Sequence, residues 1–262
     1  MKWPSDTETP DGQGVKPFLS HLEDLRATLI RCVAALAVGM AIAIPLTPQI
    51  MALLERPLRS VTDNPVQFLR SLEVAGAFTV SMKMALWAGL LFSSPFLLLF
   101  IGAFIFPGLT SKEKRAVINA SGFAVVLFVA GVLFGYTFTL PAALKIMFGM
   151  HAWLGIRPEW TVTSYVTFAL QLLIGFGLVF ELPTILLTLG KLGIVSSLQL
   201  RTMRRHAIVI ILIVAAALTP PDVFSQLLMA LPLVALYELC IWLVRLDERR
   251  KKAENTEPGP TA

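Results

Sequence analysis

Long runs of apolar residues divide this 262-residue chain and constrain its fold more than any other feature. Hydrophobic residues make up 56% of the chain and charged residues 15%, whereas an average soluble domain is about 25% charged. A transmembrane helix needs about 20 apolar residues, so the chain has room for about six spans with short connections. The runs cover residues 29–46, 78–106, 117–140, 162–189, 207–218 and 223–244. The sequence therefore predicts an all-α polytopic membrane protein with six transmembrane helices.

The fifth run is too short to cross a bilayer unaided. Its 12 residues, 207–218, reach roughly 18 Å as a helix, against a hydrocarbon core about 30 Å thick. The sixth run contains Gln226, Pro232 and Glu238, and only residues 219–222 separate it from the fifth. We therefore expect a tight hairpin that tilts its neighbours, thins the bilayer locally or leaves one mouth open to water.

The basic residues indicate the orientation of the helices. Sixteen Lys and Arg residues lie near the two ends of the chain and in the loops after the second and fourth runs, against five in the other loops. By the positive-inside rule, both termini face the cytoplasm, and loops 47–77, 141–161 and 219–222 lie outside. Residues 1–17 are polar and lack the apolar core of a signal peptide. We expect a disordered cytoplasmic tail over 1–17, a six-helix domain over 18–246 and a second cytoplasmic tail over 247–262.

Motifs of soluble enzymes are missing from the sequence. It contains no GxxxxGK[ST] phosphate loop, no HExxH zinc pair and no GxSxG nucleophile elbow, and its three histidines lie far apart. The basic residues stand in short loops between apolar runs, which makes them topology signals rather than a surface for nucleic acid. We therefore predict no catalytic residue, no metal and no cofactor.

The segment FLSHLEDLR, residues 18–26, leads into the first run and is a candidate binding segment. Its apolar residues recur at helical spacing, which predicts an amphipathic helix. On that helix Glu23 and Arg26 are three residues apart and can pair, whereas Asp24 falls on a different stripe. The simpler alternative is a solvated interfacial helix without a binding role.

Glu113 is the only acidic residue in the loop between the second and third runs, where it stands among Lys112, Lys114 and Arg115. The sequence TSKE at 110–113 matches a capping box, which gives Glu113 a structural role at the start of the third helix. Its isolation among basic residues leaves a functional role open beside the structural one.

Glu181 lies inside the fourth run, about 12 Å from its cytoplasmic end at helical rise. A carboxylate at that depth costs roughly 2.5–3.5 kcal/mol on insertion scales, so we expect it to face protein or a wet cavity, or to be protonated. Pro183 frees the carbonyl of Val179 and allows a kink there. In the sixth run, Gln226 and Glu238 are further polar groups, about 120° apart around the helix.

Along nearly the whole chain, from Phe18 to Arg245, these residues resemble a known family: TatC, the multi-spanning subunit of the twin-arginine protein translocase. Each matching stretch is weak alone, but together they are highly specific because they stand in family order and at family spacing. The stretches are FLSHLEDLR (18–26), FIFPGLTSKEKR (104–115), FGLVFELP (176–183), LTPPDVFSQ (218–226) and ALPLVALYE (230–238).

The resemblance implies a receptor for the export of folded proteins whose signal peptides carry two adjacent arginines. It implies a bacterial plasma (inner) membrane location and a cupped six-helix fold with short fifth and sixth helices. In the family, two acids on the cytoplasmic face form the signal-binding site, and they match Asp24 and Glu113, with Glu23 and Arg26 beside the first. Whether Glu23 or Asp24 is the main ligand stays open.

The resemblance also implies sites for partner proteins. Glu181 matches an intramembrane acid on the concave face of the fold. Gln226 matches a polar position where single-span TatA- or TatB-like partners dock, and Glu238 is a further intramembrane polar candidate. Other TatC copies and the lipid bilayer complete the expected partners.

Two alternatives from other functional classes remain at this stage. A proton-coupled secondary transporter of a small solute would use Glu181 as its proton carrier, and it would show solute-dependent proton flux as a purified protein. An intramembrane enzyme would need a nucleophile with its base, or a metal cluster, and the sequence offers neither.

Overall fold

The computed structural model describes residues 18–62, 68–105, 111–156, 158–191, 193–218 and 223–254, and these are almost entirely helical. The elements are α1 (Phe18–Ala43), α2 (Thr47–Leu58), β1 (Leu69–Arg70), α4 (Gly76–Ile105), α5 (Ser111–Phe134), the π-helix η1 (Gly135–Thr139), α6 (Leu140–Trp153), β2 (Trp160–Thr161), α7 (Val162–Val179), α8 (Leu182–Lys191), α9 (Ser197–Thr202), α10 (Arg204–Leu218) and α11 (Val223–Glu254).

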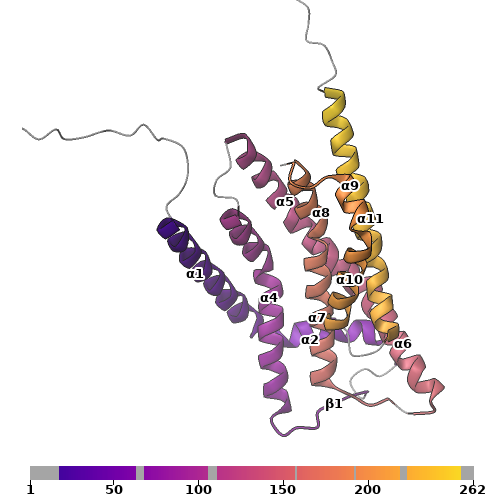
Figure 1. Cartoon of the computed structure of the whole chain (residues 1–262). Coiled ribbons are helices and arrows are strands. Elements are labelled where there is room, and N and C mark those ends of the chain that lie inside the picture. Colours follow the sequence, from indigo (N-terminus) through magenta and orange to yellow (C-terminus); the bar gives the residue numbers. More distant parts are fainter. Residues whose placement is uncertain are drawn as a thin grey trace, which may run out of the picture.

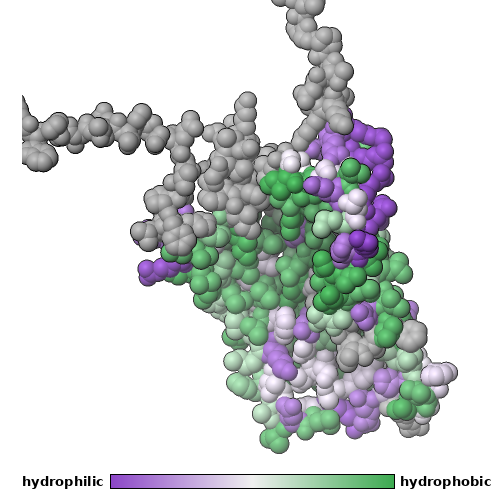
Figure 2. All heavy atoms as spheres, viewed as in Figure 1, coloured by the Kyte–Doolittle hydropathy of each residue, from purple (hydrophilic) through white to green (hydrophobic). Residues whose placement is uncertain are grey.

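Five helical stretches within the described residues are long and apolar enough to cross a membrane. They are Leu22–Ala43, Gly76–Gly102, Gly122–Trp153, Val162–Gly190 and Gln226–Arg250. The helix of the fifth apolar run, α10, has only 15 residues and is not among them. Figure 2 shows hydrophobic residues over the middle of one face and hydrophilic residues concentrated toward its two ends, as expected for a chain that spans a bilayer.

The two ends of the molecule carry different elements (Figure 1). The first turns of α1 and α5, the helix α9 and the last turns of α11 lie at one end, here called the α9 end. The opposite end carries α2 and the two-stranded parallel sheet in which Leu69 pairs with Trp160, and it is called the sheet end. Helices α7 and α8 lie in the middle of the bundle, whereas α1 stands at its edge beside α4.

The third transmembrane stretch continues past the expected boundary at Leu140. The sequence predicted a loop over 141–161, but the chain stays helical through Trp153, so that expectation was wrong for residues 141–153. The π-helix explains the continuation: Leu140 donates its N–H to the carbonyl of Gly135, a wider turn than in an α-helix. Pro141 then falls in the first turn of α6, where its missing N–H is tolerated.

Two prolines inside helices leave carbonyls that hydroxyl groups take up. Pro95 cannot bond the carbonyl of Leu91, and Ser94 Oγ donates to that oxygen at 2.7 Å. Pro57 likewise leaves the carbonyl of Leu53 without its helical donor, and the hydroxyl of Tyr136 donates to it at 2.8 Å from the π-helix. A helix in the expected outer loop 47–77 is thereby tied to the third transmembrane stretch.

The core centres on α7, whose side chains are buried over most of its length. Leu172, Phe176 and Val166 are fully buried there and belong to one cluster with residues of α2, α4, α6, α10 and α11. The buried hydroxyl of Tyr165 donates to the carbonyl of Leu54, which fixes α2 against α7. Because α7 contacts so many elements, its exit into α8 is held in a defined place.

Candidate functional site

The predicted signal-binding acids are on helix starts at the α9 end (Figure 1). Asp24 is half-buried in α1, and its backbone carbonyl accepts a hydrogen bond from Thr28 Oγ1 at 2.8 Å. Glu23 and Arg26 are exposed, and within the described part of the chain they form no ion pair with each other. Neighbouring residues on a helix point to different faces, so Glu23 is exposed whereas Asp24 is half-buried.

Glu113 lies in the first turn of α5, which begins at Ser111. A helix start at this position agrees with the capping-box pattern in the sequence. The proposed cap residue, Thr110, and the side chain of Glu113 lie outside the described residues. The structure thus places the backbone of residue 113 at the same end of the molecule as Asp24.

Glu181 stands where the fourth transmembrane stretch is interrupted. Helix α7 ends at Val179 and α8 begins at Leu182, which confirms the predicted kink beside Pro183. In the break, the Glu181 N–H donates to the carbonyl of Leu178 at 3.1 Å, one residue nearer than in an α-helix. The side chain of Glu181 points into protein, since only 3% of the residue is exposed.

The carboxylate of Glu181 is accompanied by a second buried polar group, Thr184. Glu181 Oε1 and Thr184 Oγ1 are both inaccessible to solvent; the Thr184 hydroxyl interacts with the carboxylate, but neither atom has a hydrogen bond of ordinary geometry among the described residues. A buried polar atom without a partner costs about 1–3 kcal/mol. Together the two atoms form a polar site inside an apolar bundle, one helical turn apart.

Close packing of α5 holds the break in position. A Cβ on Gly131 would lie 2.6 Å from the carbonyl oxygen of Phe176 and 2.7 Å from Cβ of Phe180. The ring of Phe134, one turn further along α5, lies 5.8 Å from that of Phe176 and 5.6 Å from that of Phe180. The residues on either side of Glu181 are therefore fixed by backbone and aromatic contacts.

The two polar candidates of α11 have partners within the α10–α11 hairpin. Gln226 Nε2 donates to the carbonyl of Leu212 at 3.0 Å. Glu238 forms an ion pair with Arg204, with 2.7 Å between Nη2 and Oε2, and both side chains are nearly half exposed. Glu238 is thus level with the first residue of α10, away from Gln226 as predicted. The structure does not bring Glu238 together with Glu181 into one polar site.

Comparisons with known proteins agree on one family. A family model described as "Sec-independent protein translocase protein (TatC)" matches residues 20–232. The chain is 36% identical to the Sec-independent protein translocase protein TatC of Aquifex aeolicus over 237 residues, which cover 90% of this chain and 98% of that one. The corresponding protein of Akkermansia muciniphila is 38% identical over 193 residues, which cover 73% of this chain and 56% of that longer one.

A solved structure gives the same result for the fold. The crystal structure of a twin-arginine translocase receptor TatC superposes with a TM-score of 0.77 at 35% identity, covering 86% of this chain and 98% of the other. The chain belongs to the TatC family. It is a multi-pass membrane component of the Tat protein translocase, with the TatC fold, and it is not an enzyme.

Membership in the TatC family decides between the alternatives left open by the sequence. The family is one of protein translocation, so a proton-coupled transporter of small solutes is no longer supported. The described residues also contain no group of three His, Cys, Asp or Glu side chains that could hold a metal ion.

Sequence reasoning missed several polar contacts of this TatC chain. Glu248, expected in a solvated tail, lies on the continuation of α11, and both its carboxylate oxygens accept hydrogen bonds from Ser197, one of them from the backbone N–H at 2.7 Å. Thr184 was not singled out, although its position three residues after Glu181 on a helix was a usable signal. The ion pair between Glu238 and Arg204 joins residues 34 apart, and in the sequence Arg204 indicates only topology.

Proposed function

We propose that this TatC-family chain is the receptor subunit of a twin-arginine translocase and binds Arg-Arg signal peptides at its α9 end. Asp24 and Glu113 are the proposed ligands. The observation that carries the proposal is the placement of two helix starts, each with an acid in or near its first turns, at one end of a TatC fold. Glu23 and Arg26 flank the site on α1.

The proposal includes a topology with the α9 end in the cytoplasm. The 16-to-5 distribution of basic residues supports it. It also takes α10 as a sixth crossing, too short to span an undistorted bilayer, so that both termini are cytoplasmic. With single cysteines in a cysteine-free background, an impermeant thiol reagent outside sealed cells should label residue 155 and not residue 199; the reverse would contradict this topology.

The chemistry of recognition follows from the charges at the α9 end. Basic residues, including Arg201 and Arg205, are exposed there and repel a peptide with two arginines. A carboxylate can hold a guanidinium through two parallel hydrogen bonds, and hydrogen bonds to charged groups contribute about 1.5–3 kcal/mol. Two carboxylates at this end therefore supply both affinity and selectivity for Arg-Arg.

Binding of synthetic signal peptides to the purified protein tests the site. Glu113→Gln keeps a cap hydrogen bond but loses the charge, so a purely structural role predicts almost no change. Under our proposal it weakens binding of an Arg-Arg peptide about ten- to hundredfold and affects a Lys-Lys peptide much less. Asp24→Asn and Glu23→Gln distinguish the two neighbouring acids, and we expect the larger loss at Asp24.

Glu73→Gln is the matched control for these charge removals, because Glu73 is exposed in the segment before α4, at the sheet end. It should leave signal-peptide binding unchanged. Equal affinities of Glu113→Gln, Asp24→Asn and this control for the Arg-Arg peptide would reject the recognition site.

A second part of the proposal concerns single-span TatA- or TatB-like partners and other TatC copies. We assign partner contact to Glu181 with Thr184, and to Gln226, whose amide N–H is already used within the hairpin. The buried polar atoms of Glu181 and Thr184 support this assignment, since they lack hydrogen bonds of ordinary geometry among the described residues and an inserted polar group would complete them.

Export of a reporter and co-purification of partners test the assignment. Glu181→Leu should leave insertion and folding nearly intact, because it removes a buried polar group, while partner association or export falls. If export and partner binding stay normal in Glu181→Leu, the carboxylate is a tolerated structural group and the assignment fails.

A further inference from the structure

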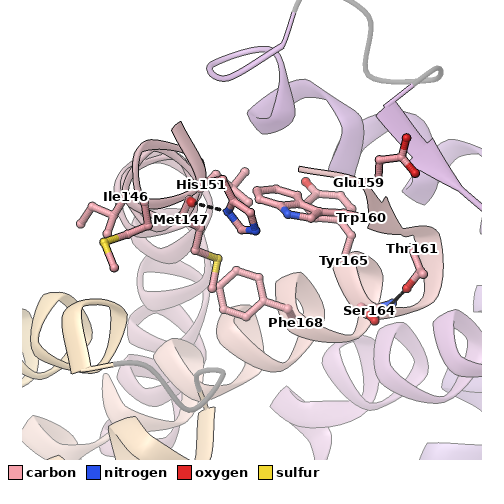
Figure 3. A pocket seen from close by; sticks show the side chains of 11 residues that line it. Ile146, Met147, His151, Glu159, Trp160, Thr161, Ser164, Tyr165 and Phe168 are labelled. Carbon is pink, nitrogen blue, oxygen red and sulfur yellow. Dashed lines mark hydrogen bonds between the residues drawn. The ribbon is translucent and has the colours of Figure 1, made fainter. Parts of the chain in front are cut away.

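A pocket of about 460 Å³ lies at the sheet end, between α6, β2 and the first turns of α7 (Figure 3). Most of its lining is apolar, with the flexible side chains of Met147 and Met150 on α6 and the ring of Phe168 on α7. It lies on elements separate from the proposed signal-binding and partner-binding residues. Nothing described so far uses it.

The pocket stands at the level of the membrane interface. The transmembrane stretch that includes α6 ends at Trp153, and the one that includes α7 begins at Val162, so the pocket lies where two apolar stretches meet the sheet end. Trp160 lines it, and tryptophan is enriched at the depth of lipid headgroups. A ligand there would have its apolar part in the hydrocarbon region and its polar part in water.

Two nitrogen atoms in the pocket are available to such a ligand. His151 Nδ1 lies 2.7 Å from the carbonyl of Met147 and donates to it, because a carbonyl oxygen only accepts; in the neutral ring Nε2 is then an acceptor, and Trp160 Nε1 is the donor. The ring of His151 lies beside that of Trp160, with 6.4 Å between centroids (Figure 3). Neither His151 Nε2 nor Trp160 Nε1 has a hydrogen-bond partner in the part of the chain that the structure describes.

An ion pair between Glu159 and Arg70 lies at the pocket and places a negative charge in its lining. Glu159 lines the pocket, and its Oε1 lies 3.2 Å from Nη2 of Arg70. Both side chains are about 60% exposed, so the pair is weak and the carboxylate can accept further hydrogen bonds. Because the carboxylate rather than the guanidinium lines the pocket, a headgroup with an outer cation fits it, and a purely anionic headgroup is repelled.

We propose that this pocket binds a zwitterionic phospholipid. One acyl chain lies among Met147, Met150 and Phe168, the phosphate or ester oxygens accept a hydrogen bond from Trp160 Nε1, and the cationic headgroup nitrogen lies against Glu159. The inference goes beyond the proposed function, since it adds a lipid site on elements that do not carry the signal-binding residues.

Fluorescence quenching tests the selectivity. A full-length variant that keeps Trp160 as its only tryptophan is reconstituted in vesicles that contain either brominated phosphatidylcholine or brominated phosphatidylglycerol, each diluted in the unbrominated other lipid. Brominated chains quench by contact, so phosphatidylcholine should quench Trp160 more strongly. A variant that keeps only Trp153, which is 80% exposed near the end of α6, is the matched control and should be quenched equally by both lipids.

Charge variants sharpen the test in opposite directions. Glu159→Gln leaves Arg70 alone and should lower the preference for the zwitterionic lipid about two- to fivefold, whereas Arg70→Gln should raise it, as expected for exposed charge pairs. Equal quenching of Trp160 by both lipids, or a preference that Glu159→Gln leaves unchanged, would overturn the proposal and favour an unselective apolar pocket, such as a seat for a partner's helix.

Native mass spectrometry of the chain with all its tryptophans is an independent test, because it does not depend on the folding of the single-tryptophan variants. One phosphatidylcholine should stay bound preferentially over phosphatidylglycerol, and this preference should fall in Glu159→Gln but not in Glu73→Gln, which removes an exposed acid from the same end. Retention of both lipids without preference contradicts the site. Signal-peptide binding should be unchanged in Glu159→Gln, so failure here is distinguishable from failure of the receptor assignment.

Discussion

Helix α1 and the α7–α8 stretch are both apolar enough to cross a membrane, but their surroundings differ. Only 6% of the most apolar part of α1 is buried inside the protein, against 50% of the most apolar part of α7–α8. Helix α1 packs mainly on α4, whereas α7 contacts α4, α5 and several shorter elements. In a bilayer, hydropathy decides whether a helix inserts, but it does not decide what the helix packs against, because lipid is as apolar as leucine.

Small residues make the contacts in both regions. In the α1–α4 pair, a Cβ on Gly39 would lie 2.4 Å from the carbonyl oxygen of Gly89. In the core, Gly131 and Gly177 play the same role between α5 and α7, where Gly177 lies against the ring of Phe128. The difference is that α1 has one such contact line and α7 has neighbours on most sides. The helix that carries Asp24 is therefore attached at one face only.

The largest effect is expected from filling the contact in the core. Gly131→Leu places a side chain where the backbone of Phe176 and the side chain of Phe180 already lie, and overpacking of this kind costs about 1–3 kcal/mol and occasionally more. Thermal unfolding in detergent should show a clear loss of stability. Gly122→Leu is the control on the same helix, since a Cβ there meets nothing within 4 Å. Equal stability of the two variants would contradict the close approach of α5 and α7.

A smaller and local effect is expected at the edge. Gly39→Leu should separate α1 from α4 and lower the global stability by less than about 1 kcal/mol, because few residues of α1 are buried. Distances between spin labels at the exposed positions Val38 and Phe92, which line the groove between the helices, should lengthen and broaden. Gly102→Leu, which meets open space on α4, should leave them unchanged. An unaltered distance in Gly39→Leu would show that α1 is held by other contacts.

The same contrast explains what the sequence could predict of the fold. The apolar runs, the short fifth helix and the break beside Pro183 follow from local composition, and all are found. The continuation of α6 and the docking of α2 do not, because they depend on contacts distant in sequence. Tyr165 and Leu54, for example, are 111 residues apart. The sequence predicts a solvated tail at Glu248 for the same reason, since its partner Ser197 lies 51 residues away.

For the candidate site, the free-energy cost of burying a charged group predicted the position of a side chain better than sequence motifs did. Glu181 could be predicted as protein-facing because a lipid-facing carboxylate is too costly, and its burial confirms this. Asp24 and Glu23 could not be distinguished from the sequence, because neighbouring acids on a helix differ only in which face its packing buries. Their roles in binding stay predictions. The burial of the Thr184 hydroxyl beside Glu181 depends on the three-dimensional packing.

Effects on stability of similar size are expected where tyrosine hydroxyls attach α2 to the core. Tyr165→Phe removes a buried hydrogen bond to Leu54 and should lower the free energy of unfolding by about 0.5–1.5 kcal/mol. Tyr136→Phe should cost less, because its bond to Leu53 is exposed and water can replace the hydroxyl. Chemical unfolding in mixed micelles measures both. A larger loss for Tyr136→Phe than for Tyr165→Phe would mean that water does not reach Leu53.

A double-mutant cycle then tests whether the Tyr136 hydroxyl compensates for the backbone N–H that Pro57 lacks. In Pro57→Ala, residue 57 regains the N–H that can bond the carbonyl of Leu53 along the helix, so the tyrosine hydroxyl becomes redundant. Tyr136→Phe should be nearly silent in the Pro57→Ala background although it is measurable in the parent, and the cycle removes the packing change that Pro57→Ala brings by itself. Tyr165→Phe, whose acceptor is Leu54, should cost the same in both backgrounds. If the loss from Tyr136→Phe is also the same in both, the hydroxyl does not compensate for Pro57, and α2 is held against the core by apolar packing and Tyr165 alone.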